Sequence, residues 1–247
     1  HGLQPDEVHQ GTPGDDGALG RLPGRQRLQP EHARPARPAG RLPAPEAAPG
    51  QDRGPVPGLA AAGAFGPLRT IQLNFGSYKP YDMTNRFFNR QLAGGAMLDI
   101  GVYALSFVRW FMSSCPAEIL SQVKFAATGV DEQAGILLKN KEEEMATVLL
   151  SLHAKQPKRG TISFDRAYIE LFEYPRGDKA IITWTGDGRR EEISAGDASN
   201  ALVYEIRDME QAVAGDPAVM HLDYTVDVMR MMTAIRQQWH MKYPEEE

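Results

Sequence analysis

The sequence predicts an α+β domain: an open-faced, predominantly antiparallel β-sheet with helices on one face, preceded by a disordered N-terminal segment. Three observations support this prediction. The composition changes sharply near residue 60 of the 247-residue chain. Beyond that point, short alternating or apolar runs follow one another with brief turns between them, which is typical of antiparallel strands. Three longer stretches have helical patterns. We therefore divide the chain into residues 1–60 and 61–247.

The first predicted elements are a strand, a loop and a helix. Arg69–Phe75 alternates apolar with polar residues, as a half-buried strand does. Gly76–Gln91 is predicted to be a polar loop that carries aromatic residues. An almost uniformly apolar helix is then expected from about Gly95 to Phe111, ahead of Pro116.

Seven strand patterns and two helical patterns follow. The predicted strands are Glu118–Ala126, Glu132–Leu138, Met145–Ala154, Thr161–Phe164, Tyr168–Phe172, Lys179–Thr185 and Glu191–Ile193. Ser199–Ala214 is expected to be a helix whose apolar stripe is Leu202, Ile206, Met209 and Val213. Asp223 is expected to cap a last helix, where Val228, Met232, Ile235 and Trp239 recur at helical spacing. We expect these helices to cover one face of the sheet.

Residues 1–60 lack the composition of a folded segment. Ile, Met, Lys, Ser, Asn, Cys, Tyr, Trp and Phe are all absent from it, and most of the chain's prolines lie there. Such a segment buries too little apolar surface to offset the entropy of ordering it. It is either a natural disordered leader or a coding region read out of frame, because Ala, Gly, Pro and Arg belong to GC-rich codons. We favour the second interpretation.

The helix after residue 94 contains the most informative pattern. Gly94 and Gly95 open it, and Asp99 and Tyr103 lie four residues apart, a spacing that puts two side chains on one face of an α-helix. A carboxylate and a phenol on an apolar helix are costly to bury unless they are paired or used. From the pattern alone, Asp99 could equally be a first-turn acid and Tyr103 a core aromatic residue. The glycines could be no more than a tight turn.

Residues 94–103, Gly-Gly-x-x-x-Asp-x-Gly-x-Tyr, resemble the signature of the Gfo/Idh/MocA family of NAD(P)-dependent sugar and cyclitol oxidoreductases. The similarity is greatest to the glucose–fructose oxidoreductase and dihydrodiol dehydrogenase branch. Three further segments are similar to this branch: Gly66-Pro67-Leu68-Arg69, Thr128-Gly129-Val130-Asp131-Glu132 and Ile235-Arg236-Gln237-Gln238-Trp239. The resemblance spans residues 63–244 in the family's order, and it implies the C-terminal substrate domain of such an enzyme.

The resemblance also implies roles for particular residues. Asp99 and Tyr103 would be catalytic and would face the substrate at the mouth of the nicotinamide pocket, where Tyr103 would exchange a proton with the substrate oxygen. Gly94 and Gly95 would let the backbone approach the cofactor. The substrate would be a sugar, a polyol or a dihydrodiol.

Asn85 and Arg86 lie in the loop before the helix, where hydroxyls of such a substrate would be bound. A solvated loop is the plainer interpretation of these two residues.

The cofactor implied by the resemblance is NAD or NADP, yet the sequence lacks the half that binds it. Gly11 to Gly17 has the wrong glycine spacing for a dinucleotide-binding loop, and Gly186-Asp187-Gly188 is typical of a hairpin turn. The family's Glu-Lys-Pro element is missing, and Lys79-Pro80 follows the first strand, so we assign it no role. We expect this chain alone to be inactive and not to bind NAD(P).

Composition excludes several other classes of function. The net charge is −5, and the first 66 residues contribute nothing to it, so the remainder is mildly acidic and unlike a nucleic-acid surface. The single cysteine, Cys115, indicates a reducing compartment, which predicts a cytoplasmic location. No metal-ligand spacing and no run of 18 apolar residues is present, so we expect neither a metal site nor a membrane span.

Smaller features are interpreted as structural. Glu142–Glu144 is expected to be a solvated hairpin turn, His153 a surface or interface residue, and Met229, Met231 and Met232 helix-packing residues. An open sheet cannot leave a broad apolar face in water, so we expect a homodimer through that face. The alternatives to an oxidoreductase are a cofactor-less binding or assembly domain and a pseudogene product.

Overall fold

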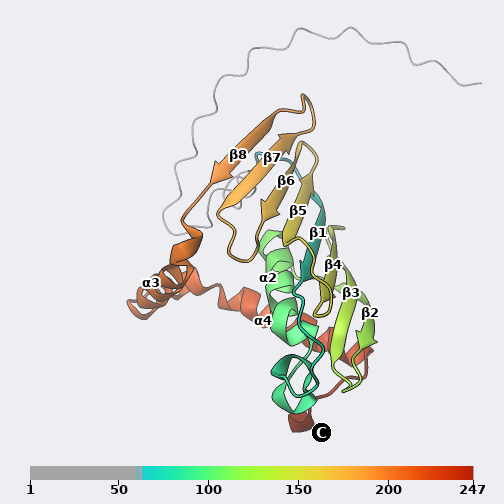
Figure 1. Ribbon diagram of the computed structural model, residues 1–247. Coiled ribbons are helices and arrows are strands. Elements are labelled where there is room, and N and C mark those ends of the chain that lie inside the picture. The colour runs from blue at the N-terminus through green and yellow to red at the C-terminus, as the bar shows by residue number, and fades with distance from the viewer. Residues whose placement is uncertain (1–59, 61–62, 247) are drawn as a thin grey trace, which may run out of the picture. The chain divides into compact units, whose positions relative to one another are not determined.

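The computed structural model describes residue 60 and residues 63–246; the disorder predicted for the N-terminal segment concerns residues outside this part. Eight strands and three α-helices are present there (Figure 1). The strands are β1 (Leu68–Gly76), β2 (Glu118–Phe125), β3 (Asp131–Lys139), β4 (Met145–Ser151), β5 (Arg159–Phe164), β6 (Ala167–Phe172), β7 (Lys179–Trp184) and β8 (Arg190–Ser194). The helices are α2 (Val102–Phe111), α3 (Ala201–Val213) and α4 (Leu222–Gln238).

The eight strands form one sheet in the order β2-β3-β4-β1-β5-β6-β7-β8 (Figure 1). All neighbours pair antiparallel except β1 and β4, which are parallel. Ile71 of β1 lies opposite Ala146 of β4 on one side and Ile162 of β5 on the other. The predicted fold class is confirmed, and each strand pattern found in the sequence corresponds to one of these strands.

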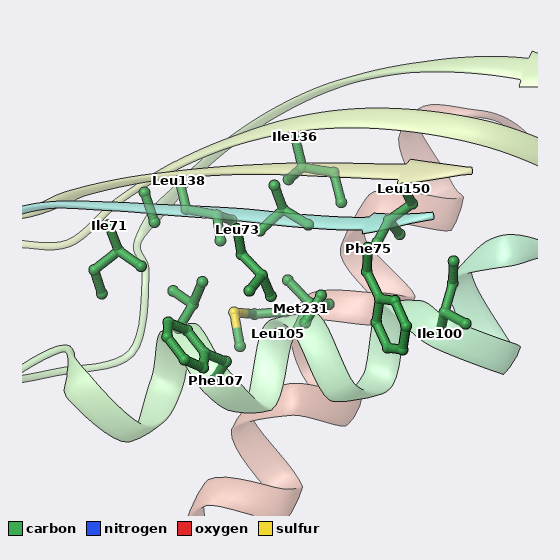
Figure 2. Packing of buried hydrophobic residues seen from close by; sticks show 14 of the residues in the cluster. Ile71, Leu73, Phe75, Ile100, Leu105, Phe107, Ile136, Leu138, Leu150 and Met231 are labelled. Atoms are coloured by element: carbon green, nitrogen blue, oxygen red, sulfur yellow. The ribbon is translucent and has the colours of Figure 1, made fainter. Parts of the chain in front are cut away.

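One face of the sheet is packed against α2 and α4. Alternate strand residues point to this face and are buried, as the period of two requires. Figure 2 shows Ile71, Leu73 and Phe75 of β1 above Leu105 and Phe107 of α2. Each of these five side chains is at most 6% exposed. The hydrophobic core therefore lies between the middle strands and α2.

The expectation that all three helices cover the sheet is wrong for α3. Its residues include none that are buried. The predicted stripe exists, but Leu202, Ile206, Met209 and Val213 are 58%, 60%, 52% and 81% exposed. The periodicity predicted the helix correctly and the burial of its stripe incorrectly.

Several local features differ from the sequence-based expectations. The loop after β1 contains two short 3₁₀ helices, Arg86–Phe88 and Arg90–Leu92. His221, in the left-handed region, precedes α4, so Asp223 is a first-turn acid and not the cap. Three further single-turn 3₁₀ helices are Ala198–Asn200, Pro217–Met220 and Pro244–Glu246.

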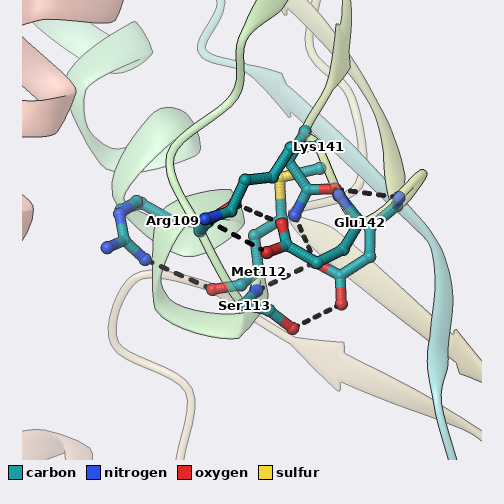
Figure 3. Close-up of polar contacts among 8 residues, drawn as sticks. Arg109, Met112, Ser113, Lys141 and Glu142 are labelled. Atoms are coloured by element: carbon teal, nitrogen blue, oxygen red, sulfur yellow. Dashed lines mark hydrogen bonds and ion pairs between the residues drawn. The ribbon is translucent and has the colours of Figure 1, made fainter.

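The turn between β3 and β4 is not fully solvated, as had been expected for Glu142–Glu144. Glu144 is buried and accepts hydrogen bonds from the Ser113 amide at 2.8 Å and from the Asn140 side chain at 2.6 Å. It thereby ties the turn to the end of α2. Figure 3 shows the polar contacts at this end, where the Arg109 guanidinium also donates to the Met112 carbonyl.

His153 and the methionines of α4 follow their predicted structural roles in part. His153 is partly buried between the rings of Tyr78 and Tyr81, with ring centroids 5.4 and 5.0 Å away. Met231 and Met232 are buried in the core, whereas Met229 is 44% exposed.

One segment, Arg90–Phe111, has the length and apolar composition of a membrane span, with a mean hydropathy of 1.3, although no run of 18 apolar residues exists. In the described structure 56% of that window is buried against the rest of the domain. Because α2 supplies Leu105, Phe107 and Val108 to the core, the segment is accounted for as a core helix.

Candidate functional site

The candidate site is built on the first turn of the helix that continues into α2. Met97–Gly101 is a π-helical turn, and the Val102 amide donates to the Met97 carbonyl five residues back. π turns inside longer helices frequently occur at functional sites. The sequence predicted a helix here but not the π turn, because an almost uniformly apolar segment does not reveal the phase shift that one additional residue in a turn produces.

The glycine pair allows close approach within the chain itself. Gly95 has φ +119°, and a Cβ atom added there would lie 2.1 Å from Oδ1 of Asp131. A Cβ atom on Gly94 would lie 2.5 Å from the carbonyl oxygen of Arg86. Close contacts within the chain therefore explain why both positions are glycine. The assignment of these two residues to cofactor binding stays a prediction.

Asp99 lies in the π turn and forms an ion pair with Arg86. The Arg86 guanidinium donates to Oδ1 of Asp99 at 2.9 Å. The aspartate side chain is only 18% exposed and the arginine side chain 62%, so a largely buried carboxylate faces an accessible cation. The sequence placed these residues in neighbouring elements, and the structure brings them together.

Asn85 and Phe87 lie on either side of Arg86 and make different contacts. The Asn85 side chain accepts from the Phe87 amide at 3.1 Å and caps the first 3₁₀ helix. The Arg86 guanidinium lies over the Phe87 ring at 4.1 Å from the centroid, and the Lys79 ammonium is also 4.1 Å from that centroid. Asn85 thus acts on the chain locally, and two cations gather at one ring beside Asp99.

Tyr103 is 45% exposed, and its ring lies 6.2 Å from that of Phe75. Its backbone carbonyl accepts from the Tyr174 hydroxyl at 2.7 Å. Within the described residues its own hydroxyl forms no hydrogen bond, with Asp99 or any other group. Asp99 is paired with Arg86 and does not satisfy that hydroxyl. An accessible phenol follows a paired carboxylate along one helix.

Two residues at this site were not singled out as functional from the sequence. Asp131 is buried and accepts from the Met97 amide at 2.6 Å, at the start of the π turn. The Tyr243 hydroxyl donates to the Gly94 carbonyl at 2.6 Å. Asp131 could have been found from the sequence, because it is an acid placed just before the apolar run of β3. No local pattern marks Tyr243.

No group of three His, Cys, Asp or Glu residues within residues 63–246 could hold a metal ion. Cys115 is partly buried, and burial raises the pKa of its thiol.

Comparison with known proteins shows that part of the chain is similar to one family. Residues 57–170 match the GFO/IDH/MocA C-terminal domain. Trans-1,2-dihydrobenzene-1,2-diol dehydrogenase of Xenopus laevis is 29% identical over 125 residues, which cover 50% of this chain and 37% of that enzyme. The human enzyme of the same name is 30% identical over 114 residues, covering 46% and 34%. The chain thus spans about a third of the length of these curated relatives.

Solved structures with the same fold include two oxidoreductases. Aldose-aldose oxidoreductase from Caulobacter crescentus, complexed with glycerol, has a TM-score of 0.62 and 18% identity, over 73% of this chain and 56% of that one. A 3-ketoreductase from Actinomadura kijaniata in complex with NADP has a TM-score of 0.60 and 18% identity, over 74% and 57%. At these identities the likeness concerns the fold alone.

Proposed function

We propose that this chain, which carries a GFO/IDH/MocA C-terminal domain related to NAD(P)-dependent sugar and diol oxidoreductases, supplies the substrate half of such an enzyme. The substrate is a hydroxyl compound: a sugar, a polyol or a dihydrodiol. The observation that supports this best is the Arg86–Asp99 ion pair on a π turn, followed along the helix by the accessible Tyr103 hydroxyl. We keep its cytoplasmic location as part of the proposal.

The polar groups of this site suit an alcohol substrate. A carboxylate accepts from a substrate hydroxyl and a guanidinium donates to its oxygen, so the pair can orient a diol. The Tyr103 hydroxyl has no partner among the described residues, and in the proposal it exchanges a proton with the reacting oxygen. Asn85 caps the 3₁₀ helix that begins at Arg86, and in the proposal its amide group lies beside the substrate hydroxyls.

The described residues do not fit a dinucleotide. Residues 63–246 contain no Gly-x-Gly-x-x-Gly loop between a strand and a helix N-terminus, which is the usual site for a pyrophosphate. The space at Gly94 and Gly95 is taken by Arg86 and Asp131 of the same chain. We therefore derive no reaction step through NAD(P) here, and the proposal places its binding outside the described part.

A binding experiment on the chain itself tests the substrate role. Ligand-observed NMR with glucose, glycerol and a trans-dihydrodiol should detect at least one complex with a Kd of about 1 to 10 mM. Asp99→Asn should weaken that complex about ten-fold, because a hydrogen bond to a charged group is lost. The matched control is Asp165→Asn, which breaks another Arg–Asp pair, with Arg69 at 2.6 Å, and should leave binding unchanged.

Two results would contradict the proposal: no binding of any of these compounds, or equal effects of the two Asp→Asn changes. Titration with NAD and NADP should give no binding up to about 1 mM, a range that covers weak complexes. Binding of a polyol without any activity in a cofactor-completed enzyme would favour the alternative, a cofactor-less binding domain.

In an enzyme completed by a cofactor-binding half, Tyr103→Phe keeps the ring and removes the hydroxyl. The turnover number should fall by about 10²- to 10⁴-fold, the usual share of general acid–base catalysis. Substrate affinity should change by less than about ten-fold, since one neutral hydrogen bond contributes about 1 kcal/mol. Unchanged turnover would remove Tyr103 from the chemistry.

The homodimer also belongs to this proposal, through the sheet face that α2 and α4 leave open. Leu120 of β2 and Leu137 of β3 are register partners on that face, and Leu120 is 68% exposed. Leu149 of β4 is 48% exposed beside them. Because solvent-exposed leucines gathered in one patch favour association, sedimentation should give a dimer, and Leu120→Glu should give a monomer. A wild-type monomer at about 50 µM would contradict it, since an interface of about 1,600 Å² persists there.

A further inference from the structure

Two residues distant in sequence hold the backbone at the start of the π turn. Asp131 begins β3 and is fully buried, and its Oδ2 atom accepts from the Met97 amide at 2.6 Å. Tyr243 lies beyond α4 and is 5% exposed, and its hydroxyl donates to the Gly94 carbonyl at 2.6 Å. Helix N-termini have amides without partners, and Ala96, which precedes this turn, has no side chain to cap them.

The two contacts lie on either side of Gly95, whose carbonyl binds the Asp99 amide. The Asp99 amide donates to the Gly95 carbonyl at 3.2 Å. Gly95 therefore lies between a carbonyl held by Tyr243 and an amide held by Asp131. Its φ of +119° brings Cα so close to Oδ1 of Asp131 that a Cβ atom would clash. The same buried carboxylate thus explains both the cap of the turn and the glycine.

The C-terminal residues are themselves anchored. Glu246 forms two hydrogen bonds with the Arg236 guanidinium of α4, at 2.6 and 2.7 Å, and accepts from the Tyr243 amide at 2.9 Å. Arg90, just before the glycine pair, donates to the Lys242 carbonyl at 2.6 and 2.9 Å. Residues 242–246 therefore connect α4 to the start of the candidate site.

We propose that Asp131 and Tyr243 are positioning residues, which together fix the Gly94–Met97 backbone and hence the place of the Asp99 carboxylate. The inference rests on the proposed function only in taking Asp99 as the substrate-facing group. Neither residue is proposed to touch the substrate. The Oδ1 atom of Asp131 has no partner among the described residues, which makes this cap sensitive to its protonation state.

Burial raises the pKa of Asp131 to about 7, against the opposing effects of the Met97 and Ala96 amides and of Arg236. The other titratable groups around it are Tyr243 and, through Arg236, Glu246. Because the folded-state pKa is the higher one, the neutral carboxyl stabilises the folded state fully below about pH 4. That contribution is lost as the pH rises through about 7. The turn should therefore loosen as the pH rises from about 4 to about 7.

Amide hydrogen exchange on the full chain tests the proposal without any ligand. Asp131→Ala removes the acceptor, Asp131→Asn keeps an acceptor without the charge, and Tyr243→Phe removes only the hydroxyl. Tyr168→Phe, the same change at a tyrosine that is 37% exposed on β6, is the control. Exchange in residues 95–99 should be about five- to ten-fold faster in Asp131→Ala and Tyr243→Phe, the effect of one lost hydrogen bond, and unchanged in the control.

The readout that separates positioning from general stability is local and depends on pH. After correction for intrinsic rates, wild-type exchange in residues 95–99 should rise as the pH rises from about 4 to about 7, and Asp131→Asn should abolish that rise. Exchange in β5 and β6 should not change with either variant. Wild-type protection in Tyr243→Phe, or equal acceleration across the sheet, would overturn the proposal. If Asp131→Ala does not fold, the other two variants decide.

Polyol binding distinguishes this inference from the proposed function. If neither the wild-type chain nor any variant binds a polyol, but the exchange results are as expected, the proposed function fails and the positioning role stands. If wild type binds and Tyr243→Phe binds equally well, with unchanged local exchange, the positioning role fails alone.

Discussion

Helices α2 and α3 both carry apolar residues, but these residues lie in opposite surroundings. The first helix was predicted as almost uniformly apolar from about Gly95 to Phe111, and its α-helical part is Val102–Phe111 after a π turn. The second was predicted with one apolar stripe over Ser199–Ala214 and forms over Ala201–Val213. In α2, Leu105 and Val108 are fully buried against the sheet, whereas Leu202 and Ile206 of α3 are 58% and 60% exposed. A periodic stripe therefore predicts a helix that needs an apolar neighbour, but it does not say whether the described domain supplies that neighbour.

The matched pair Leu105→Ala and Leu202→Ala measures this difference directly, and the change in α2 has the largest expected effect. Leu105→Ala should lower the free energy of unfolding by about 2 to 5 kcal/mol, because it removes buried methyl groups and leaves a cavity. Urea denaturation followed by far-ultraviolet circular dichroism measures it. A loss under about 1 kcal/mol would mean that α2 is not packed as described.

An intermediate effect is expected where α2 meets the sheet most closely. A Cβ atom on Gly160 of β5 would lie 2.3 Å from the Phe107 ring, and that ring is confined by Phe111 and Tyr174 at 5.2 and 4.8 Å between centroids. Gly160→Ala should therefore cost about 1 to 3 kcal/mol of stability through overpacking.

The Phe107→Leu background is the control for this change. It provides room, so the cost of Gly160→Ala should be smaller there in a double-mutant cycle. An equal cost in both backgrounds would locate the strain elsewhere in the strand.

The smallest effect belongs to Leu202→Ala in α3. Because the side chain is already mostly in water and alanine favours helices slightly more than leucine, stability should change by no more than about 0.5 kcal/mol. The same urea experiment applies. A loss comparable to that of Leu105→Ala would show that α3 is covered in solution, by a second copy or by residues outside the described part, and the comparison would be broken.

Much of the fold was predictable because the residue pattern of a strand is local in the sequence. In β1, Ile71, Leu73 and Phe75 alternate with polar residues, and that period of two specifies both the strand and its buried face. The parallel pairing of β1 with β4 was not predictable, since residues about 75 positions apart carry no local signal for each other. The disposition of α3 was mispredicted because exposure depends on neighbours, not on periodicity.

The candidate site was predictable only in part. The motif placed Asp99 and Tyr103 on one helix, but the π turn, the Arg86 contact and the buried cap from Asp131 depend on how separate segments meet. Glu144 shows the same limit: three successive glutamates predict a solvated turn, yet one of them is buried by Ser113 and Asn140. The composition of a segment predicts its average exposure to solvent, whereas the burial of one side chain depends on the particular residues that bind it.

The position of β1 in the sheet has a consequence for the order of assembly. This strand is the earliest of the eight in the chain, yet it lies between β4 and β5 and hydrogen-bonds to both. Until it is inserted, β2-β3-β4 and β5-β6-β7-β8 are two separate antiparallel hairpin units, each built from local contacts. Joining them requires closing a loop from β1 to β4 that contains Arg86, Asp99 and Tyr103 of the candidate site. Folding of the domain should therefore be limited by this non-local step. The segment that binds substrate in our proposal is also the one whose closure completes the sheet.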